Sequence, residues 1–132
     1  MKKRYITSLN QIPQLAKALS GKLKGGEILA LIGSLGSGKT AFTKHLAKFL
    51  KIKKTVSSPS FVLMNLFQTK TKKGKKITLY HLDLYRTRNF KEIRTLGITE
   101  FWGKPGTLTV IEWANKIKRH LPKKTTLIQF KN

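Results

Sequence analysis

The chain has 132 residues, no cysteine and a formal net charge of +23, from 28 basic and five acidic side chains. This length suits one domain with its own core, and an apolar share of 39% argues against disorder despite the charge. The absence of cysteine excludes disulfides and thiolate metal sites, and no apolar run approaches the roughly 18 residues of a membrane span. We therefore expect a single domain over residues 1–132, in the cytoplasm, with neither a membrane segment nor a secretory signal.

The excess of lysine has two interpretations. Lysine can serve as a general surface residue, or it can attract a polyanionic partner, because basic side chains release counterions from phosphates. The charge is densest over residues 51–54, 70–76 and 116–124, and no RNA-binding motif with interleaved aromatic residues accompanies it. Charge alone therefore indicates only that acidic partners are attracted.

The first part of the chain predicts two strands, each followed by a helix. A short strand is expected over residues 4–7, and a helix over residues 10–20, capped by Asn10. The stretch GGEILALIG at 25–33 is short, almost wholly apolar and bounded by glycine, which is typical of a strand buried on both faces. Apolar residues at helical spacing over 39–50 predict an amphipathic helix.

The second part predicts a hairpin, a short helix and two more strands. Residues 61–67 and 77–85 are expected to form strands on either side of a turn at Gly74. A short helix over 89–96 ends at the glycine that follows it. The remaining predicted strands are 107–113 and 125–130. Strands that alternate with helices indicate an α/β fold.

Residues 33–40 read GSLGSGKT and match the phosphate-binding pattern G-x-x-x-x-G-K-[ST] at every fixed position. A predicted buried strand precedes the match and a predicted helix follows it, which argues against a glycine-rich turn that matches by chance. Glycines let the backbone approach a phosphate, and loop N–H groups with a helix N-terminus attract the anion. We expect Lys39 to reach the β- and γ-phosphates of a nucleotide, and Thr40 to bind Mg²⁺. The expected nucleotide-binding residues are Gly33, Ser34, Leu35, Gly36, Ser37, Gly38, Lys39, Thr40 and Ala41.

A magnesium nucleotide also calls for a carboxylate near the end of a neighbouring strand. Glu27 begins the strand that leads into the loop, so it lies at the wrong end of the sheet. Glu92 falls on a surface helix, and Glu100 follows no strand. Asp83 and Glu112 each end an apolar strand, so we expect one or both to face the phosphates. The alternative for each is a carboxylate that caps a helix or meets a lysine.

Other polar and aromatic residues allow less definite predictions. His81 shares the strand face of Asp83, where it either orients a water or, as we favour, forms a hydrogen-bonded core histidine. Trp102 and Trp113 are predicted to pack rather than to stack on a base. Residues 115–118 read NKIK, so the N-K-x-D guanine motif of many GTPases lacks its aspartate.

Five segments occur in an order that resembles the bacterial TsaE family. They are GSLGSGKT (33–40), SSPSF (57–61), HLDLYR (81–86), LGITEF (96–101) and VIEW (110–113). Members of this family are small ATPases required for making threonylcarbamoyladenosine on tRNA. The resemblance covers nearly the whole chain, and HLDLYR and the Ser-Pro-Ser-Phe segment are more specific than the phosphate loop.

The resemblance implies a P-loop NTPase-like three-layer sandwich with a mixed, largely parallel central sheet. It implies ATP hydrolysis with Mg²⁺, weak without partners, with Thr40 and Glu112 at the metal. Asp83 corresponds to the motif aspartate needed for hydrolysis, and Ser60 lies in a switch-like loop near the γ-phosphate. The implied partners are TsaB and TsaD. TsaD transfers the threonylcarbamoyl group to tRNA, and hydrolysis by TsaE drives or resets the assembly, through which tRNA is reached.

The chain departs from the family pattern at several positions. Ser34 replaces a frequent aspartate, Ala41 replaces a second hydroxyl residue, and Ala114 replaces a proline. Loss of the hydroxyl at Ala41 is expected to slow hydrolysis if that group positions water. Family members often continue beyond the position of Asn132, so nucleotide contacts from such a segment are expected to be absent. Two other functions stay open: a small-molecule P-loop kinase, and a non-catalytic, nucleotide-dependent RNA-binding module.

Overall fold

The structure is a computed structural model that describes residues 1–54 and 64–131. Ser60 and the first three residues of the strand predicted over 61–67 lie outside these ranges. The elements of the described residues, in chain order, are β1 (Lys2–Ile6), α1 (Gln11–Gly21), β2 (Glu27–Ile32), α2 (Lys39–Phe49), β3 (Met64–Lys70), β4 (Lys76–Asp83), α3 (Phe90–Thr95), β5 (Thr107–Glu112), the 3₁₀ helix η1 (Ala114–His120) and β6 (Thr126–Phe130).

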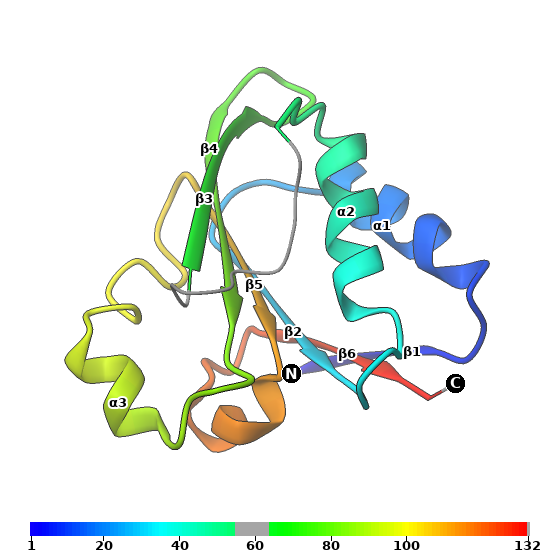
Figure 1. The fold of residues 1–132 in the computed structure, drawn as a ribbon. Helices are drawn as coiled ribbons and strands as arrows, with labels where there is room; N and C mark the ends of the chain where they lie inside the picture. The colour runs from blue at the N-terminus through cyan, green and yellow to red at the C-terminus, as the bar shows by residue number, and fades with distance from the viewer. Residues whose placement is uncertain (55–63, 132) are drawn as a thin grey trace.

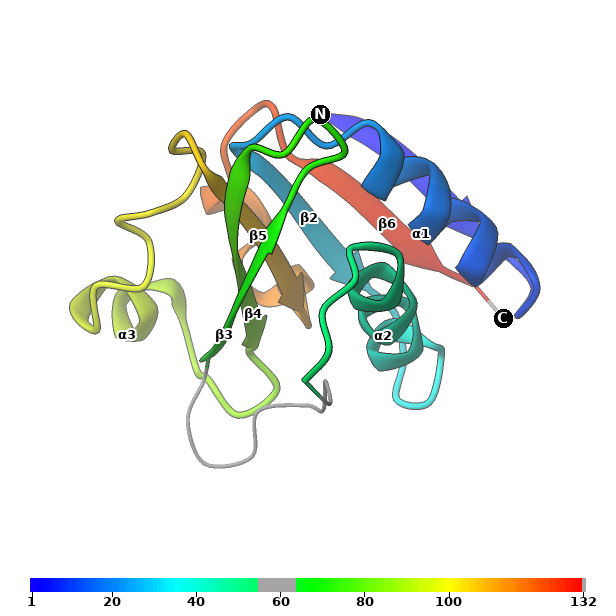
Figure 2. The same ribbon diagram turned by 90° about the horizontal axis from the view of Figure 1, so that it is seen from above.

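These strands form one sheet of six in the order β1-β6-β2-β5-β4-β3. All neighbours are parallel except β3, which pairs antiparallel with β4 at the edge, as the predicted hairpin requires. Helices α1 and α2 cover one face of the sheet, and α3 and η1 lie on the other (Figures 1 and 2). The expected three-layer α/β architecture with a mixed, largely parallel sheet is therefore confirmed.

Strand β2 lies at the centre of the sheet and separates two hydrophobic cores. Leu29 and Leu31 point into the core beneath α1 and α2, whereas Ile28 and Ala30 point into the core beneath α3 and η1. All four are at most 3% exposed, because successive side chains of a strand alternate between its faces. This pattern explains why the strand reads as a continuous apolar run rather than an alternating one. As predicted, Trp102 packs against the second core.

The helix starts follow local polar chemistry that was predicted only in part. Asn10 precedes α1 but has α-helical backbone angles and makes no side-chain cap, so the predicted cap is wrong. The Asn10 Oδ1 atom instead accepts the hydroxyl of Ser8. At α3, the Asn89 side chain does accept the N–H of Glu92, at 3.1 Å, as an N-cap residue should.

The carboxyl ends of three neighbouring strands meet at one edge of the sheet. In the register of the parallel strands, Leu31 of β2 pairs with Glu112 of β5, and Glu112 pairs with Asp83 of β4. The loop over residues 33–38 leaves β2 at the same edge and leads into α2. Ligand sites of open α/β sheets form at such an edge, where loops leave neighbouring strands. Within the described part of the chain, no helix is long and apolar enough to cross a membrane.

Candidate functional site

The loop between β2 and α2 is fixed by two glycines that leave no room for a side chain. A Cβ atom on Gly33 would lie 2.5 Å from Oγ of Ser37 and 2.9 Å from Cβ of Phe130. A Cβ atom on Gly38 would lie 2.6 Å from Cδ1 of Ile12, and Gly38 also has a φ of +110°, which side chains rarely tolerate. The loop is therefore pressed against β6 and α1 in one backbone conformation.

Lys39 crosses the inside of this loop. Its Nζ atom donates hydrogen bonds to the carbonyl oxygens of Gly33 and Ser34, both at 2.7 Å. The same ammonium lies 4.1 Å from the ring centroid of Trp113, which is a cation–π distance. Burial lowers the pKa of Lys39, and the nearby carboxylates oppose that shift. The two hydrogen bonds hold the Lys39 side chain next to the loop backbone.

Glu112 is 2% exposed and has hydrogen bonds to both of its carboxylate oxygens. Oε1 accepts the hydroxyl of Thr40 at 2.9 Å, and Oε2 lies 2.6 Å from Nε2 of His81. With Glu112 ionised, His81 must carry its proton on Nε2 and donate it to this bond. His81 is fully buried, and its Nδ1 atom has no hydrogen-bond partner among the described residues. The predicted core histidine is therefore tied to the carboxylate of the site.

Asp83 lies beside Glu112 but is only half-buried. Its Oδ1 atom accepts the N–H of Tyr85 at 3.0 Å, which turns the chain sharply after β4. Burial raises the pKa of Asp83, the neighbouring Glu112 charge adds to this rise, and the hydrogen bond from Tyr85 opposes it. This carboxyl group is consequently easier to protonate than an ordinary aspartate.

A cavity of about 360 Å³ joins these groups. Its lining residues are Leu35, Gly36, Gly38, Lys39, Thr40, Ala41, Asp83, Tyr85, Glu112 and Trp113. Both carboxylates selected from the sequence therefore share a cavity with residues of the phosphate loop. The remaining predicted loop residues, Gly33, Ser34 and Ser37, form the base of the loop, where Lys39 binds them. Ser60 lies outside the described residues.

Trp113 forms a wall of the site that the sequence did not suggest. It packs on the second core, as predicted, but its backbone is left-handed, with φ 60° and ψ 37°, and its ring reaches Lys39. The ring of Tyr85 lies 5.0 Å from the indole, and Lys116 donates to the carbonyl oxygens of Tyr85 and Thr87. A left-handed non-glycine residue costs about 1–3 kcal/mol, and such strain concentrates at functional sites.

The arrangement suits an anion together with a divalent cation. Loop N–H groups, the N-terminus of α2 and Lys39 are positive, whereas Thr40 and Glu112 offer two oxygen atoms 2.9 Å apart. Among the described residues, no cluster of three or more His, Cys, Asp or Glu side chains could hold a metal ion. The residues therefore fit a Mg²⁺ ion that takes its other ligands from phosphate and water, which is the usual situation for this ion.

Comparison with known proteins agrees with this site. The sequence model of the family described as threonylcarbamoyl adenosine biosynthesis protein TsaE matches residues 6–132. The chain belongs to the TsaE family. The TsaE relative from Rickettsia bellii is 38% identical over 125 residues, which cover 94% of this chain and 81% of the relative. The relative from Aquifex aeolicus is 41% identical over 120 residues, covering 89% and 80% of the two chains. Both are named tRNA threonylcarbamoyladenosine biosynthesis protein TsaE.

A solved structure has a similar fold. The crystal structure of YdiB from Bacillus subtilis superposes with a TM-score of 0.65 at 30% sequence identity, covering 89% of this chain and 68% of that one. The family resemblance found in the five sequence segments is thus confirmed. This TsaE-family chain has the P-loop fold that the resemblance implied.

Proposed function

We propose that this chain is a Mg²⁺-dependent ATPase that serves tRNA threonylcarbamoyladenosine biosynthesis. The observation that carries the proposal is the 2.9 Å hydrogen bond from Thr40 to Glu112, next to the buried ammonium of Lys39. The family and its named relatives support the pathway, and the geometry of the site supports the chemistry.

Lys39 is the group that exchanges partners when a nucleotide binds. Its ammonium holds two loop carbonyl oxygens at 2.7 Å, so it already lies at the concave side of the loop. The β- and γ-phosphates are stronger partners than neutral carbonyls, because they add the Coulomb attraction of full negative charges to the hydrogen bonds of the ammonium. The loop N–H groups and the N-terminus of α2 complete the phosphate site.

Thr40 and Glu112 form the protein side of the metal site. Mg²⁺ would neutralise the charge on the phosphate oxygens, and the Thr40 hydroxyl and the Glu112 carboxylate would hold it, directly or through water. His81 keeps one Glu112 oxygen occupied at 2.6 Å, so the carboxylate presents the other oxygen towards Thr40. His81 is therefore a positioning residue, because it acts through Glu112.

Asp83 has an indirect part in hydrolysis. It follows Glu112 across the sheet register, and its carboxyl group lines the same cavity. Burial raises its pKa, which makes Asp83 a better proton acceptor than an exposed aspartate, so we assign to it the orientation of water or of the switch-like loop. The hydroxyl of Ser60 in that loop is proposed to lie near the γ-phosphate, on the strength of the family resemblance alone.

The proposed partners are proteins of the TsaB and TsaD type. Residues 1–132 would act as one cytoplasmic ATPase domain, weak by itself, whose hydrolysis of ATP drives or resets the TsaB–TsaD assembly. The family resemblance assigns the acyl transfer to TsaD, and the described cavity of this chain offers groups that would bind phosphate and metal for ATP hydrolysis.

The structure argues against the alternative of a small-molecule kinase with a basic lid. The lysine-rich turn at 71–75 joins β3 to β4 at the end opposite Asp83. Strand β4 has eight residues between that turn and the site. At about 3.4 Å per residue the turn lies some 24 Å away, too far to cover the phosphates.

The test is phosphate release from ATP, with and without a TsaB–TsaD pair and with Mg²⁺ or a chelator. We expect the partners and Mg²⁺ to raise turnover, and Lys39→Ala, Asp83→Ala and Glu112→Ala each to reduce it at least a hundredfold. Lys91→Ala, an exposed change on α3, is the control and should leave turnover unchanged. The proposal fails if the partners neither bind the chain nor raise turnover, or if ATP is consumed only with a small-molecule acceptor.

A further inference from the structure

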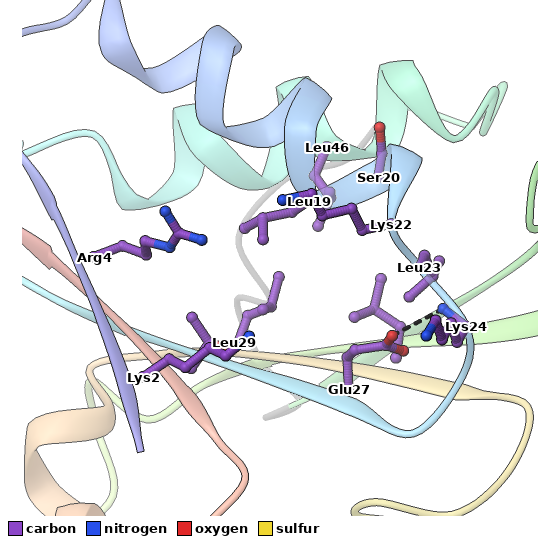
Figure 3. Close-up of a pocket in the computed structure, with 12 residues that line it drawn as sticks. Lys2, Arg4, Leu19, Ser20, Lys22, Leu23, Lys24, Glu27, Leu29 and Leu46 are labelled. Atoms are coloured by element: carbon purple, nitrogen blue, oxygen red, sulfur yellow. Dashed lines mark hydrogen bonds between the residues drawn. The ribbon is translucent and has the colours of Figure 1, made fainter.

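A second cavity lies at the amino end of the sheet, away from the site described above. Its volume is about 440 Å³, and it opens between α1 and the strands β1, β2 and β6 (Figure 3). The floor is apolar and consists of Leu19, Leu23, Leu29, Leu46 and Leu108. The amino ends of the strands carry no residue of the candidate nucleotide site, so the proposed ATPase leaves this cavity unused.

Four cationic side chains surround the leucine floor. Lys2 and Arg4 come from β1 on one side, and Lys22 and Lys24 come from the connection between α1 and β2 on the other (Figure 3). All four are exposed. None of these side chains makes an ion pair or a hydrogen bond to another residue within the described ranges. Their donors are therefore available to a ligand.

The one carboxylate in the cavity does little to offset this charge. Glu27 uses its two oxygen atoms to accept the backbone N–H groups of Lys24 and Gly25, at 2.8 and 2.7 Å. It thereby shapes the connection before β2 instead of pairing with a cationic side chain. The cavity accordingly keeps an excess of three positive charges, from four cations and one carboxylate.

The cationic surface continues past the end of α1. A neighbouring cavity of about 550 Å³ shares Ser20 with the first and is lined by Lys51, Lys70 and Lys72. The ammonium of Lys72 would lie 3.3 Å from a Cβ atom on Gly21, the last residue of α1, so this lysine stands between the two cavities. We call the cationic surface around both cavities the amino-end surface. Its cations are Lys2, Arg4, Lys22, Lys24, Lys51, Lys70 and Lys72.

We propose that the amino-end surface binds the phosphate backbone of RNA. Seven cations around one carboxylate repel one another, and a polyanion relieves this repulsion while its counterions are released. Six of the seven are lysines, point charges on flexible stems that contact phosphates without reading sequence. Leu19, the most exposed of the floor leucines, offers an apolar contact for the ribose of an unpaired strand. A short acidic peptide would occupy one cavity, whereas an RNA strand matches a row of cations that extends over both.

RNA would bind at the amino ends of the parallel strands, and the nucleotide would bind at their carboxyl ends. Strand β2 runs from Glu27 at the RNA-binding edge to Ile32 next to the phosphate loop. Its six residues span about 17 Å at roughly 3.3 Å per residue, so the two ligands do not compete for space. The inference extends the proposed function, because it gives this chain an RNA contact of its own.

The test is fluorescence anisotropy with a fluorescein-labelled single-stranded RNA, on the full chain without nucleotide. The test variant reverses Lys22, Lys24 and Lys72 to Glu, and the matched control variant reverses Lys91, Lys118 and Arg119, exposed cations on the α3 and η1 side. Each variant lowers the net charge by six, from +23 to +17. Since a single strand contributes a slope of about 0.7 per phosphate contact, the test variant should lower the salt slope by about 2 and weaken binding at least tenfold.

The control variant should bind RNA within about threefold of the unchanged chain. Equal weakening in both variants would mean that only bulk charge matters, and it would overturn the proposal, as would an unchanged chain that does not bind RNA. Poly-glutamate of matched charge serves as a competitor, and competition as effective as that of unlabelled RNA would assign the surface to an acidic protein instead. Urea unfolding midpoints verify that both variants fold.

One further variant separates this inference from the proposed function. Lys39→Ala changes the nucleotide site only, so it should abolish ATP hydrolysis and leave RNA affinity within about twofold of the unchanged chain. Loss of RNA binding in this variant would tie the RNA to the phosphate loop and contradict the assignment to the amino-end surface. An inactive chain that still binds RNA through Lys22, Lys24 and Lys72 would refute the ATPase and keep the inference.

Discussion

Replacing His81 by leucine removes the imidazole that hydrogen-bonds the buried Glu112 carboxylate. The pair is closed at 2.6 Å, and the two side chains are 0% and 3% exposed, so water cannot substitute for the lost donor. Breaking a buried hydrogen bond to a charged group costs about 3 kcal/mol of unfolding free energy. With a urea m-value of about 1.5 kcal/mol/M, the unfolding midpoint should fall by about 2 M.

Urea unfolding, followed by tryptophan fluorescence, measures this effect, and two variants serve as controls. His81→Gln retains an N–H donor close to the position of Nε2 and should recover more than half of the lost stability. Thr109→Val removes a fully buried hydroxyl that has no hydrogen-bond partner within the described residues, so it should cost less than about 1 kcal/mol. A midpoint for His81→Leu within about 0.5 M of the unchanged chain would refute the idea that His81 supports Glu112.

Three more outcomes follow from the geometry of the site. Because burial raises the folded-state pKa of Asp83 above its ordinary value of 3.8, ionisation of Asp83 weakens the fold as the pH rises through that raised pKa. Asp83→Asn should therefore raise the urea midpoint at pH 7.5, and the gain should vanish as the pH falls towards 3.8. Gly36→Ala and Gly38→Ala both force a side chain to positive φ, at a cost of about 1 kcal/mol. Of these two changes, only Gly38→Ala would also make the new Cβ atom clash with α1. The melting temperature measured by differential scanning calorimetry should therefore fall further for Gly38→Ala than for Gly36→Ala, by about 4 °C or more. In a variant whose single tryptophan is Trp113, addition of Mg-ATP should change the tryptophan fluorescence, because the Lys39 ammonium leaves the indole ring for the phosphates.

The parts of the fold that were predicted are those that local sequence determines. An apolar run bounded by glycines specified β2, and the phosphate-loop pattern followed it. Elimination among five acidic residues selected Asp83 and Glu112, and the structure has both at the cavity of the loop. The rule behind this selection is geometric, since carboxyl ends of neighbouring parallel strands share one edge. The catalytic roles of these carboxylates stay predictions.

The features that were missed depend on contacts distant in the chain. His81 and Glu112 are 31 residues apart, and nothing in either segment indicates that one hydrogen-bonds the other. The left-handed backbone of Trp113 arises where β5 turns into η1, and no sequence pattern predicts a tryptophan in that conformation. The cap expected at Asn10 is absent because the Asn10 side-chain oxygen accepts the Ser8 hydroxyl, a competitor that is equally close in sequence. The order of the strands in the sheet likewise depends on distant contacts, because it follows from how the helices pack against the two faces of the whole sheet.

The most direct measurement is a crystal structure of the chain with Mg²⁺ and a non-hydrolysable ATP analogue. The proposed mechanism predicts phosphates in the loop over 33–40, the Lys39 ammonium released from the two carbonyl oxygens, and a Mg²⁺ ion at the Thr40 hydroxyl with Glu112 as a direct or water-mediated ligand. Phosphates bound elsewhere, or a metal ion held by Asp83 while Glu112 stays bonded to Thr40, would contradict it.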